Sequence, residues 1–466
     1  MLFAPNLPPL PPITDPILLQ DCTALAEWIR KGKRSAEQVV SAYIQRTKAV
    51  NVSLNAMVDD RYEAAVREAR EVDRTLATLT ETQREALKET KPLLGVPFTC
   101  KEVVMMQGMN HTGGLVTRKG IKANADAEAN TRLKQAGAIA LGVTNVPEIG
   151  IWCETTSTLY GRSNNPYDFT RTPGGSSGGE SSLLSGCGTP LSVGSDVGGS
   201  IRMPAYFTGT FGHKPSPEWV SLINGAMFPE KVKNSRVLAI GPLCRSARDL
   251  TLTLEVMAPL KAKGLRSKVD KTNLSKVKIW WAEGLDTPIV SPTNAAQKKA
   301  LKEAVTYLNQ AYGARTERSD AWLSWEWLRF WCGFGRFTFG LLMMATVQKL
   351  SKVKEEPKNS PHYWKNKKKM LIDKLGSNSV LIIPMLPRHY YHNEILTNTL
   401  DVSHTALFNA TEMPGSAVPL GLDNEGMPLG VQVVALPDDD HLCMAVAEAL
   451  EKKFGGWISP SPIAVK

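Results

Sequence analysis

The sequence Gly174-Gly175-Ser176-Ser177-Gly178-Gly179-Glu180 is followed further along the chain by Gly194-Ser195-Asp196-Val197-Gly198-Gly199-Ser200-Ile201-Arg202. Each segment carries serines next to paired glycines. Because glycine adopts backbone angles that other residues avoid, successive N–H groups in such a segment can turn toward one point. The second segment can therefore direct several amides at a developing oxyanion, with a serine hydroxyl beside them. Together these features indicate acyl transfer.

Two other interpretations of the glycine-serine segments are less favourable. A flexible linker would be flanked by polar, low-complexity sequence, whereas Leu183, Leu184, Leu191 and Val193 between the segments are apolar. A phosphate-binding loop would end in Gly-Lys-Ser/Thr or show the spacing GxGxxG, and neither segment does. The chain therefore needs a base that can activate a serine.

The histidines do not lie in the sequence setting of a serine-histidine triad. Neither Ser176 nor Ser200 stands in a Gly-x-Ser-x-Gly nucleophile elbow. We expect structural or surface roles for the seven histidines, which are His111, His213, His362, His389, His392, His404 and His441.

A lysine is the alternative base. Lys101 ends the short apolar run Leu94–Cys100, and the ends of strands often supply catalytic groups in α/β proteins. To act as a base near pH 8, this lysine would need its pKa lowered by about two units from about 10.4. Burial disfavours the ammonium form and can supply that shift. The apolar neighbours that make burial plausible are Val96, Phe98, Val103 and Val104.

The Lys101 segment, the segment Gly174–Glu180 and the segment Gly194–Lys214, in this order, resemble the amidase signature family. The resemblance spans nearly the whole chain and includes residues 421–432. It implies that Ser200 is the nucleophile, Ser176 a bridging serine that follows a cis peptide, and Lys101 the general base. It also implies an oxyanion hole formed by backbone amides, without a cofactor or a metal. The amides in question are those of Val197, Gly198, Gly199 and Ser200.

Asp196 and Arg202 lie on either side of the predicted nucleophile. We expect them to brace this loop by hydrogen bonds. The alternative is a solvated ion pair of little consequence.

Within the family, several segments are most similar to members that hydrolyse fatty acid amides; these are residues 160–168, 198–205, 211–216 and 454–457. This implies a serine amidase that cleaves primary amides such as oleamide, or N-acylethanolamines such as anandamide. The products would be a fatty acid and ammonia or an amine, released through an acyl-enzyme on Ser200. Two alternatives stay open. One is a glutamine amidase of the A-type amidotransferase class that supplies ammonia to a partner, and the other is a catalytically silent lipid-binding relative.

Composition limits the other classes. The chain has 466 residues, 42% of them hydrophobic, and a net charge of +10, yet no nucleic-acid-binding module is recognisable. Part of the positive charge gathers in residues 349–369, which favours contact with an anionic membrane surface. The seven cysteines are scattered and odd in number, which favours reduced thiols. A homodimer stays open.

The helix signals are clearest near the two ends of the chain. Ser35-Ala36-Glu37-Gln38 resembles a capping box that opens a helix to about Val50, and a second amphipathic helix covers about residues 62–79. Asp440 is predicted to cap a last helix that runs to Phe454.

Strand signals alternate with these helices. Residues 138–143 and 380–383 are predicted as buried strands, the second stopped by Pro384. This alternation predicts an α/β fold in which a large, mixed, twisted sheet is covered by helices. We expect residues 1–16, which are rich in proline, to form an extended arm, and residues 17–466 to form a single catalytic domain.

An aromatic stretch at residues 322–345 admits two interpretations. Because charged residues interrupt it, no window of about 18 apolar residues exists and a spanning helix is not expected. Residues 322–370 are instead predicted as an insertion that either touches a membrane or roofs the substrate channel. No signal peptide is seen in the sequence, so we expect a peripheral membrane or cytoplasmic location.

Overall fold

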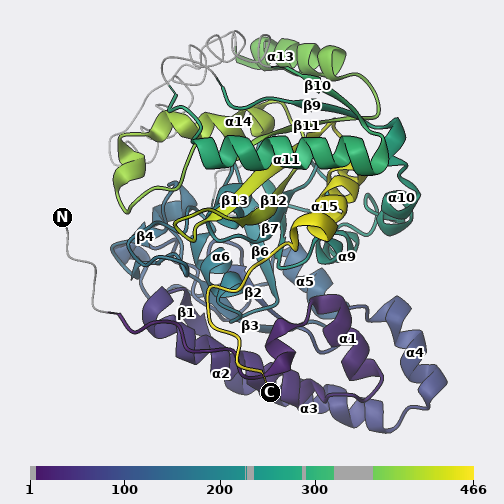
Figure 1. The fold of residues 1–466 in the computed structure, drawn as a ribbon. Helices are drawn as coiled ribbons and strands as arrows, with labels where there is room; N and C mark the ends of the chain where they lie inside the picture. Colours follow the sequence, from purple (N-terminus) through teal and green to yellow (C-terminus); the bar gives the residue numbers. More distant parts are fainter. Residues whose placement is uncertain (1–6, 226, 228–235, 286–289, 320–359, 466) are drawn as a thin grey trace.

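The computed structural model describes residues 7–225, 227, 236–285, 290–319 and 360–465 (Figure 1). Its main strands are β1 (Met57–Asp60), β2 (Pro97–Lys101), β3 (Ile139–Thr144), β6 (Leu191–Asp196), β7 (Phe211–Lys214), β8 (Ala239–Cys244), β9 (Lys278–Trp281), β10 (Arg315–Arg318), β11 (Ser379–Pro384), β12 (Gly415–Leu422) and β13 (Pro428–Ala435). They form one 11-stranded sheet in the order β1-β3-β2-β6-β8-β7-β12-β13-β11-β9-β10. A separate pair consists of β4 (Thr156–Ser157) and β5 (Gly161–Arg162).

The sheet is mixed. The neighbours β3-β2-β6 and β11-β9-β10 run parallel, whereas the pairs that join them through β8, β7, β12 and β13 are antiparallel. Strands β2, β3, β6 and β11 are buried along their whole length, as expected for apolar strands covered on both faces. This confirms the predicted α/β class with a large mixed sheet.

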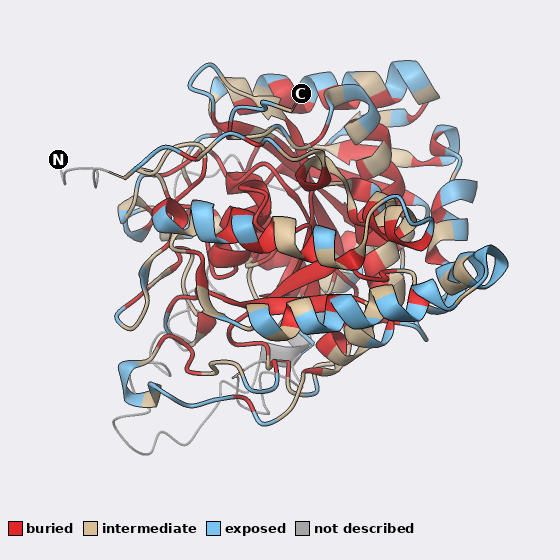
Figure 2. Ribbon diagram, turned by 90° about the horizontal axis from the view of Figure 1, so that it is seen from below, coloured by how far each residue is buried: buried red, intermediate tan, exposed pale blue. Residues whose placement is uncertain are grey.

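Helices surround the sheet. They are α1 (Cys22–Arg30), α2 (Ala36–Leu54), α3 (Tyr62–Ala77), α4 (Glu81–Thr90), α5 (Glu128–Gln135), α6 (Gly178–Ser185), α7 (Arg202–Phe207), α9 (Ala247–Met257), α10 (Leu265–Lys271), α11 (Ala295–Tyr312), α13 (Ser360–Leu375), α14 (Ser403–Ala410) and α15 (Asp440–Phe454). Short 3-10 turns occur at Pro16–Leu19, Val116–Arg118, Glu148–Gly150, Leu274–Lys276, Glu394–Leu396 and Thr399–Val402. Figure 1 shows α1–α4 gathered at one end of the molecule, while α15 packs on strands β12 and β13 and α11 packs on strands β13 and β11. In Figure 2 the strands are almost wholly buried, and exposed residues lie on the outer sides of the helices.

Most of the predicted elements are confirmed. Ser35 caps α2 within a complete capping box with Gln38, and α3 begins at Tyr62 as expected. The strand expected at residues 138–143 is β3.

The strand predicted at residues 380–383 is β11, which ends at Pro384 as expected and includes this proline opposite Val431 of β13. One boundary prediction was wrong. Asp440 does not cap α15, because Asp439 precedes the helix and the Asp440 carboxylate accepts hydrogen bonds from Ser216 instead.

The described part of the predicted N-terminal arm is packed against the C-terminal segment. Leu10 and Ile13 are buried, and the Ile13 amide donates to the Pro462 carbonyl at 2.8 Å. In return, the Ala464 amide donates to the Ile13 carbonyl at 2.8 Å. Ile13 and residues 462–464 therefore lie side by side.

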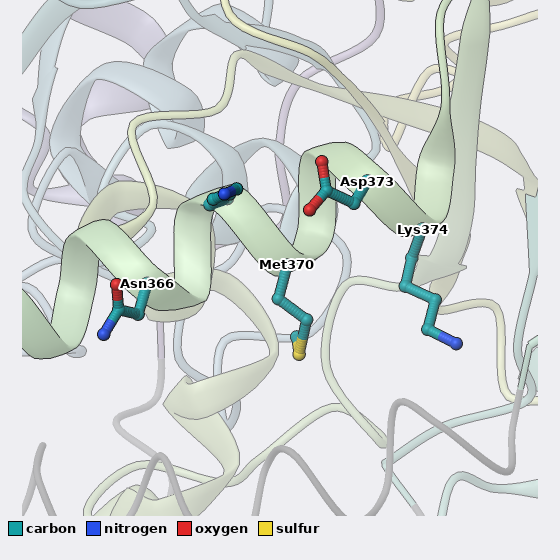
Figure 3. Close-up of a pocket in the computed structure, with 5 residues that line it drawn as sticks. Asn366, Met370, Asp373 and Lys374 are labelled. Atoms are coloured by element: carbon teal, nitrogen blue, oxygen red, sulfur yellow. The ribbon is translucent and has the colours of Figure 1, made fainter.

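The aromatic stretch at residues 322–345, and with it most of the predicted insertion at 322–370, lies outside the described residues. Helix α13 follows it and lines a hollow of about 530 Å³ with Asn366, Lys369, Met370, Asp373 and Lys374 (Figure 3). This hollow contains none of the predicted site residues. Within the described parts of the chain, no helix has the length and apolar character needed to cross a membrane.

Candidate active site

Lys101 and Ser176 meet in the interior of the protein. Lys101 is the last residue of β2, and Ser176 lies just before α6, after a cis peptide bond from Gly175 as the family resemblance implied. The Lys101 Nζ atom lies 2.6 Å from Ser176 Oγ, and both residues are about 1% exposed. The structure therefore brings together two of the predicted catalytic residues.

Ser195 completes the surroundings of the Lys101 amine. Its Oγ lies 3.0 Å from Lys101 Nζ and its carbonyl oxygen lies 3.4 Å away, so both can accept hydrogen bonds from the amine. A neutral amine has two N–H groups and one lone pair. If Ser195 accepts both N–H groups, the lone pair is left facing the Ser176 hydroxyl.

Burial changes the acidity of Lys101. Desolvation lowers its pKa from 10.5 to about 7, against the opposing charges of Asp196 and Glu180. The direction agrees with the shift expected from the apolar neighbours of this lysine. Lys101 therefore has a substantial neutral fraction near neutral pH, which a base requires.

The loop that carries Ser200 joins β6 to α7. Asp196 ends β6, and its carboxylate accepts hydrogen bonds from the amides of Gly199 at 2.7 Å and Ile201 at 3.1 Å. Ser200 is partly exposed, in contrast to Lys101 and Ser176. The amide of Ser177 donates to the Ser200 carbonyl at 3.2 Å, which holds the two glycine-serine segments together.

Asp196 and Arg202 form a fully buried ion pair. The Arg202 guanidinium donates to both carboxylate oxygens at 3.1 Å, and both side chains are 0% exposed. Burial alone would raise the pKa of Asp196, but the charge and hydrogen bonds of Arg202 outweigh it and hold that pKa well below its usual range. The pair is thus an internal brace of the loop and not a solvated surface pair.

The Gly199 amide serves Asp196 in this structure, in place of the oxyanion role predicted for it. An N–H group that donates to a carboxylate at 2.7 Å is not directed at a substrate. Among the described residues, the other three predicted donors, the amides of Val197, Gly198 and Ser200, have no hydrogen-bond acceptor.

The first two residues of α6 are glycines that permit close packing just after Ser176. A Cβ on Gly178 would lie 2.3 Å from Thr155 Oγ1, and one on Gly179 would lie 2.6 Å from the Asn145 carbonyl oxygen. Because real Cβ atoms do not approach so closely, only glycine lets α6 start at this point.

Comparisons with known proteins agree with this geometry. Residues 38–279 match the family described as Amidase. The chain is 36% identical to fatty-acid amide hydrolase 2-A of Danio rerio, over 100% of this chain and 95% of that protein. It is 38% identical to fatty-acid amide hydrolase 2 of Homo sapiens, over 96% of this chain and 92% of that protein. The chain belongs to the amidase signature family.

More distant members of this amidase family share the fold. The A-type component of a glutamyl-tRNA(Gln) amidotransferase from Oleidesulfovibrio alaskensis is 27% identical over 94% of this chain and 98% of that protein. The solved structure of 6-aminohexanoate cyclic dimer hydrolase superposes with a TM-score of 0.76 at 23% identity, covering 94% of this chain and 97% of that one. The chain is therefore an amidase-family hydrolase.

Several residues that support this amidase site were missed in the sequence. Glu180 is fully buried below Lys101 and accepts hydrogen bonds from Thr99 at 2.5 Å and Thr144 at 2.7 Å. Desolvation raises the pKa of this carboxyl to about 7, although the hydrogen bonds and Lys101 oppose it. Its place at the end of the segment Gly174–Glu180 could have indicated a role in the site. A glutamate in the first turn of a helix is also favoured by the helix dipole, however, so this position alone did not reveal the role.

The C-terminal half supplies further support. Asn409 of α14 donates to Asp196 at 2.8 Å, and Gln432 of β13 accepts from Arg202 at 3.0 Å. Both partners lie more than 200 residues from the loop in sequence. A lone asparagine and a lone glutamine carry no sequence signal that would have revealed this role.

His213 has a structural role, as expected for the histidines of this chain. It lies within β7, fully buried, with Nδ1 2.8 Å from Ser416 Oγ and Nε2 3.0 Å from Asp440 Oδ1. Because Ser416 is itself buried, this serine, histidine and aspartate are closed to a substrate.

Proposed function

We propose that this amidase hydrolyses fatty acid amides through an acyl-enzyme on Ser200. The observation that carries the proposal is the 2.6 Å approach of Lys101 Nζ to Ser176 Oγ, buried and with the lysine pKa lowered to about 7. An amine in that state can accept a proton from a hydroxyl. Ser200 lies in the adjoining loop, where a partly exposed hydroxyl can meet a carbonyl carbon.

The proposed reaction moves one proton out and back. Lys101 accepts the proton of Ser176, Ser176 accepts that of Ser200, and Ser200 Oγ attacks the amide carbonyl. The free amides of the loop stabilise the oxyanion, where each donor contributes about 3 kcal/mol by analogy with known oxyanion holes. The proton then returns through Ser176 to the departing amine, and water hydrolyses the ester.

The substrate class is proposed from likeness to relatives. The two proteins at 36% and 38% identity are both named fatty-acid amide hydrolases, and the match spans nearly the full length of each. Oleamide and N-acylethanolamines such as anandamide are therefore the proposed substrates. Release of ammonia from glutamine for a partner protein is the second candidate, because an amidotransferase component of the same family matches at lower identity.

A hydrolysis panel tests the proposal. Purified protein is given oleamide, anandamide or glutamine, and the released acid is quantified by mass spectrometry. We expect turnover of at least one fatty amide and none of glutamine. Covalent labelling by a fluorophosphonate should disappear in Ser200→Ala while Ser177→Ala keeps it. Preference for glutamine would overturn the substrate class, and labelled Ser200→Ala would overturn the nucleophile.

A further inference from the structure

Helix α14 touches the Ser200 loop and the end of β6. Thr405, the third residue of this helix, is fully buried, and its Oγ1 donates to the Gly198 carbonyl at 2.5 Å. The approach is so close that a Cβ on Gly199 would lie 2.2 Å from Thr405 Oγ1. The loop and the helix are therefore closely packed at the peptide group that joins Gly198 to Gly199.

That peptide is held at both edges. The Gly198 carbonyl accepts from Thr405, and the N–H on the other edge of the same peptide plane, that of Gly199, donates to Asp196 at 2.7 Å. A peptide group is planar, so fixing its oxygen and its hydrogen fixes the orientation of the whole plane. The amides on either side, those of Gly198 and Ser200, take their directions from it.

The plane needs such a restraint because it lies between two glycines. Glycine accepts positive and negative φ at similar cost, and Gly199 has a φ of +122°. Without Thr405, the plane is held through the Gly199 N–H alone, and it can tilt about that hydrogen bond. Such a tilt would turn the neighbouring amides away from the oxyanion that they should stabilise.

From this geometry we propose that Thr405 is a positioning residue for the oxyanion loop: its hydroxyl holds the 198–199 peptide in the orientation that leaves the Gly198 and Ser200 amides free for substrate. The inference rests on the proposed nucleophile Ser200. It concerns a residue of α14 that touches neither the reacting carbonyl nor Lys101. Its effect should therefore appear in the transition state more than in substrate binding.

The chain offers a matched control at the end of the same helix. Thr411 follows the last residue of α14, is 0% exposed, and donates its hydroxyl to the Leu407 carbonyl at 2.8 Å. Thr405 Oγ1 also lies 2.9 Å from the Val402 carbonyl, but a hydroxyl has one proton, and its shorter contact is the one with Gly198. The two threonines therefore differ in the acceptor of that proton, which is a loop carbonyl for Thr405 and a carbonyl of the same helix for Thr411. Thr405→Val and Thr411→Val thus each remove one buried threonine hydroxyl. The hydroxyl of Thr405 bonds to the loop, whereas that of Thr411 bonds to its own helix.

The experiment measures two quantities on each variant. The first is the rate constant of fluorophosphonate labelling, and the second is kcat and KM for a fatty amide. We expect Thr405→Val to slow labelling and kcat about 10- to 100-fold with KM changed less than about threefold, since losing a whole oxyanion donor costs more. Thr405→Ser, which keeps the hydroxyl, and Thr411→Val should both stay within about threefold of the wild type.

Each outcome decides the inference. Equal rates for Thr405→Val and Thr411→Val, or a Thr405→Ser that is folded but as slow as Thr405→Val, would overturn it. Should Thr405→Val fail to fold, Thr405→Ala is held to the same criteria. If the wild type is labelled yet cleaves no fatty amide, the proposed substrate class is rejected. The labelling rates of the variants then still test the role of Thr405. If Ser200→Ala is labelled like the wild type, the nucleophile and this inference fall together.

Discussion

At the scale of single residues, the proposed base Lys101 is the side chain whose acidity is changed by its environment. A lysine on the surface would be charged at every physiological pH, because its pKa is about 10.4. Here desolvation lowers the pKa to about 7, and Ser195 offers acceptors for the two N–H groups that a neutral amine retains. Position and acidity therefore both favour a base directed at Ser176.

The pH profile should report this lysine. Only neutral Lys101 accepts a proton, so kcat/KM for a fatty amide should be level above pH 8 and should fall about tenfold per unit well below pH 7. The measurement is a steady-state profile from pH 5.5 to 9, with circular dichroism at each pH to verify folding. A profile that stays level down to pH 5.5 would contradict the assignment of Lys101 as the base.

Glu180 should move that profile in a known direction. Its carboxylate raises the pKa of Lys101 by stabilising the ammonium, so Glu180→Gln should shift the midpoint to lower pH. Thr99 and Thr144 donate to different carboxylate oxygens, so in glutamine one hydroxyl keeps an oxygen acceptor. The other hydroxyl faces the NH2 group and can accept a hydrogen bond from it, which limits the structural damage. A midpoint that moves upward, measured as before on folded protein, would mean that the charge of Glu180 does not act on Lys101.

Amide and ester substrates should separate the two tasks of Lys101. An amine must be protonated as it leaves, whereas an alcohol needs less help, so Lys101→Ala should lose far more amidase than esterase activity. We expect a difference of about 100-fold between the two losses, within the range typical of general acid–base catalysis. Paired assays on an oleoyl amide and an oleoyl ester provide the test. Equal losses on both would show that Lys101 does not handle the amine proton.

At the scale of elements, the turn from β6 into α7 is built around one buried ion pair. Asp196 receives two loop amides, Arg202 and Asn409, and every one of these contacts lies in the interior. Removing one charge of a buried pair leaves the other uncompensated, which typically costs about 3–5 kcal/mol. The loop that carries Ser200 thus depends on a charge that never meets the substrate.

Asp196→Asn should therefore lower both stability and activity. We expect a loss of about 3 kcal/mol in the free energy of unfolding, since Arg202 keeps its charge without a carboxylate. Asp270→Asn is the matched control, because Asp270 pairs with Arg266 at a side-chain exposure of 61% and such pairs contribute about 1 kcal/mol or less. Thermal melting and fluorophosphonate labelling of both variants measure the effect. Similar losses in the two variants would contradict the argument.

Sequence patterns predicted the strands and loops of this site better than the hydrogen-bond partners of its buried side chains. The glycine-serine segments and the apolar run before Lys101 carry local signals, and the strand and loop that they predict are present. Asp440 shows where such signals fail: it resembled a helix cap, yet its carboxylate is committed to His213 and Ser216 more than 220 residues away. The direction of a side chain depends on tertiary packing, which no local pattern contains.

The same limit explains the Gly199 amide. The sequence Val197-Gly198-Gly199-Ser200 predicts a loop with freely directed amides, but it does not say which acceptor each amide finds. Asp196 is three residues away and takes that amide. Long-range partners such as Asn409 and Gln432 were likewise invisible, since single amide side chains occur throughout any protein.

At the scale of the whole molecule, Arg46 joins segments from both ends of the chain. Its guanidinium, on α2, donates to the Pro11 carbonyl at 2.6 Å, to the Gly186 carbonyl at 2.8 Å and to Ser461 Oγ at 2.7 Å. Those partners belong to the N-terminal arm, the end of α6 and the C-terminal segment. The side chain is about 5% exposed, so its partners cannot turn to water if it is removed.

Arg46→Met should consequently loosen the contact between the two ends of the chain. Methionine keeps most of the apolar stem but leaves buried acceptors without a donor, and each such group costs about 1–3 kcal/mol. We expect the half-life of thermal inactivation to shorten at least tenfold, with kcat/KM at 25 °C nearly unchanged because no partner of Arg46 lies at the Ser200 loop. Arg67→Met is the control, since Arg67 is 69% exposed and only 3.9 Å from Glu63. If both variants inactivate at the same rate, Arg46 does not hold the ends of the chain together.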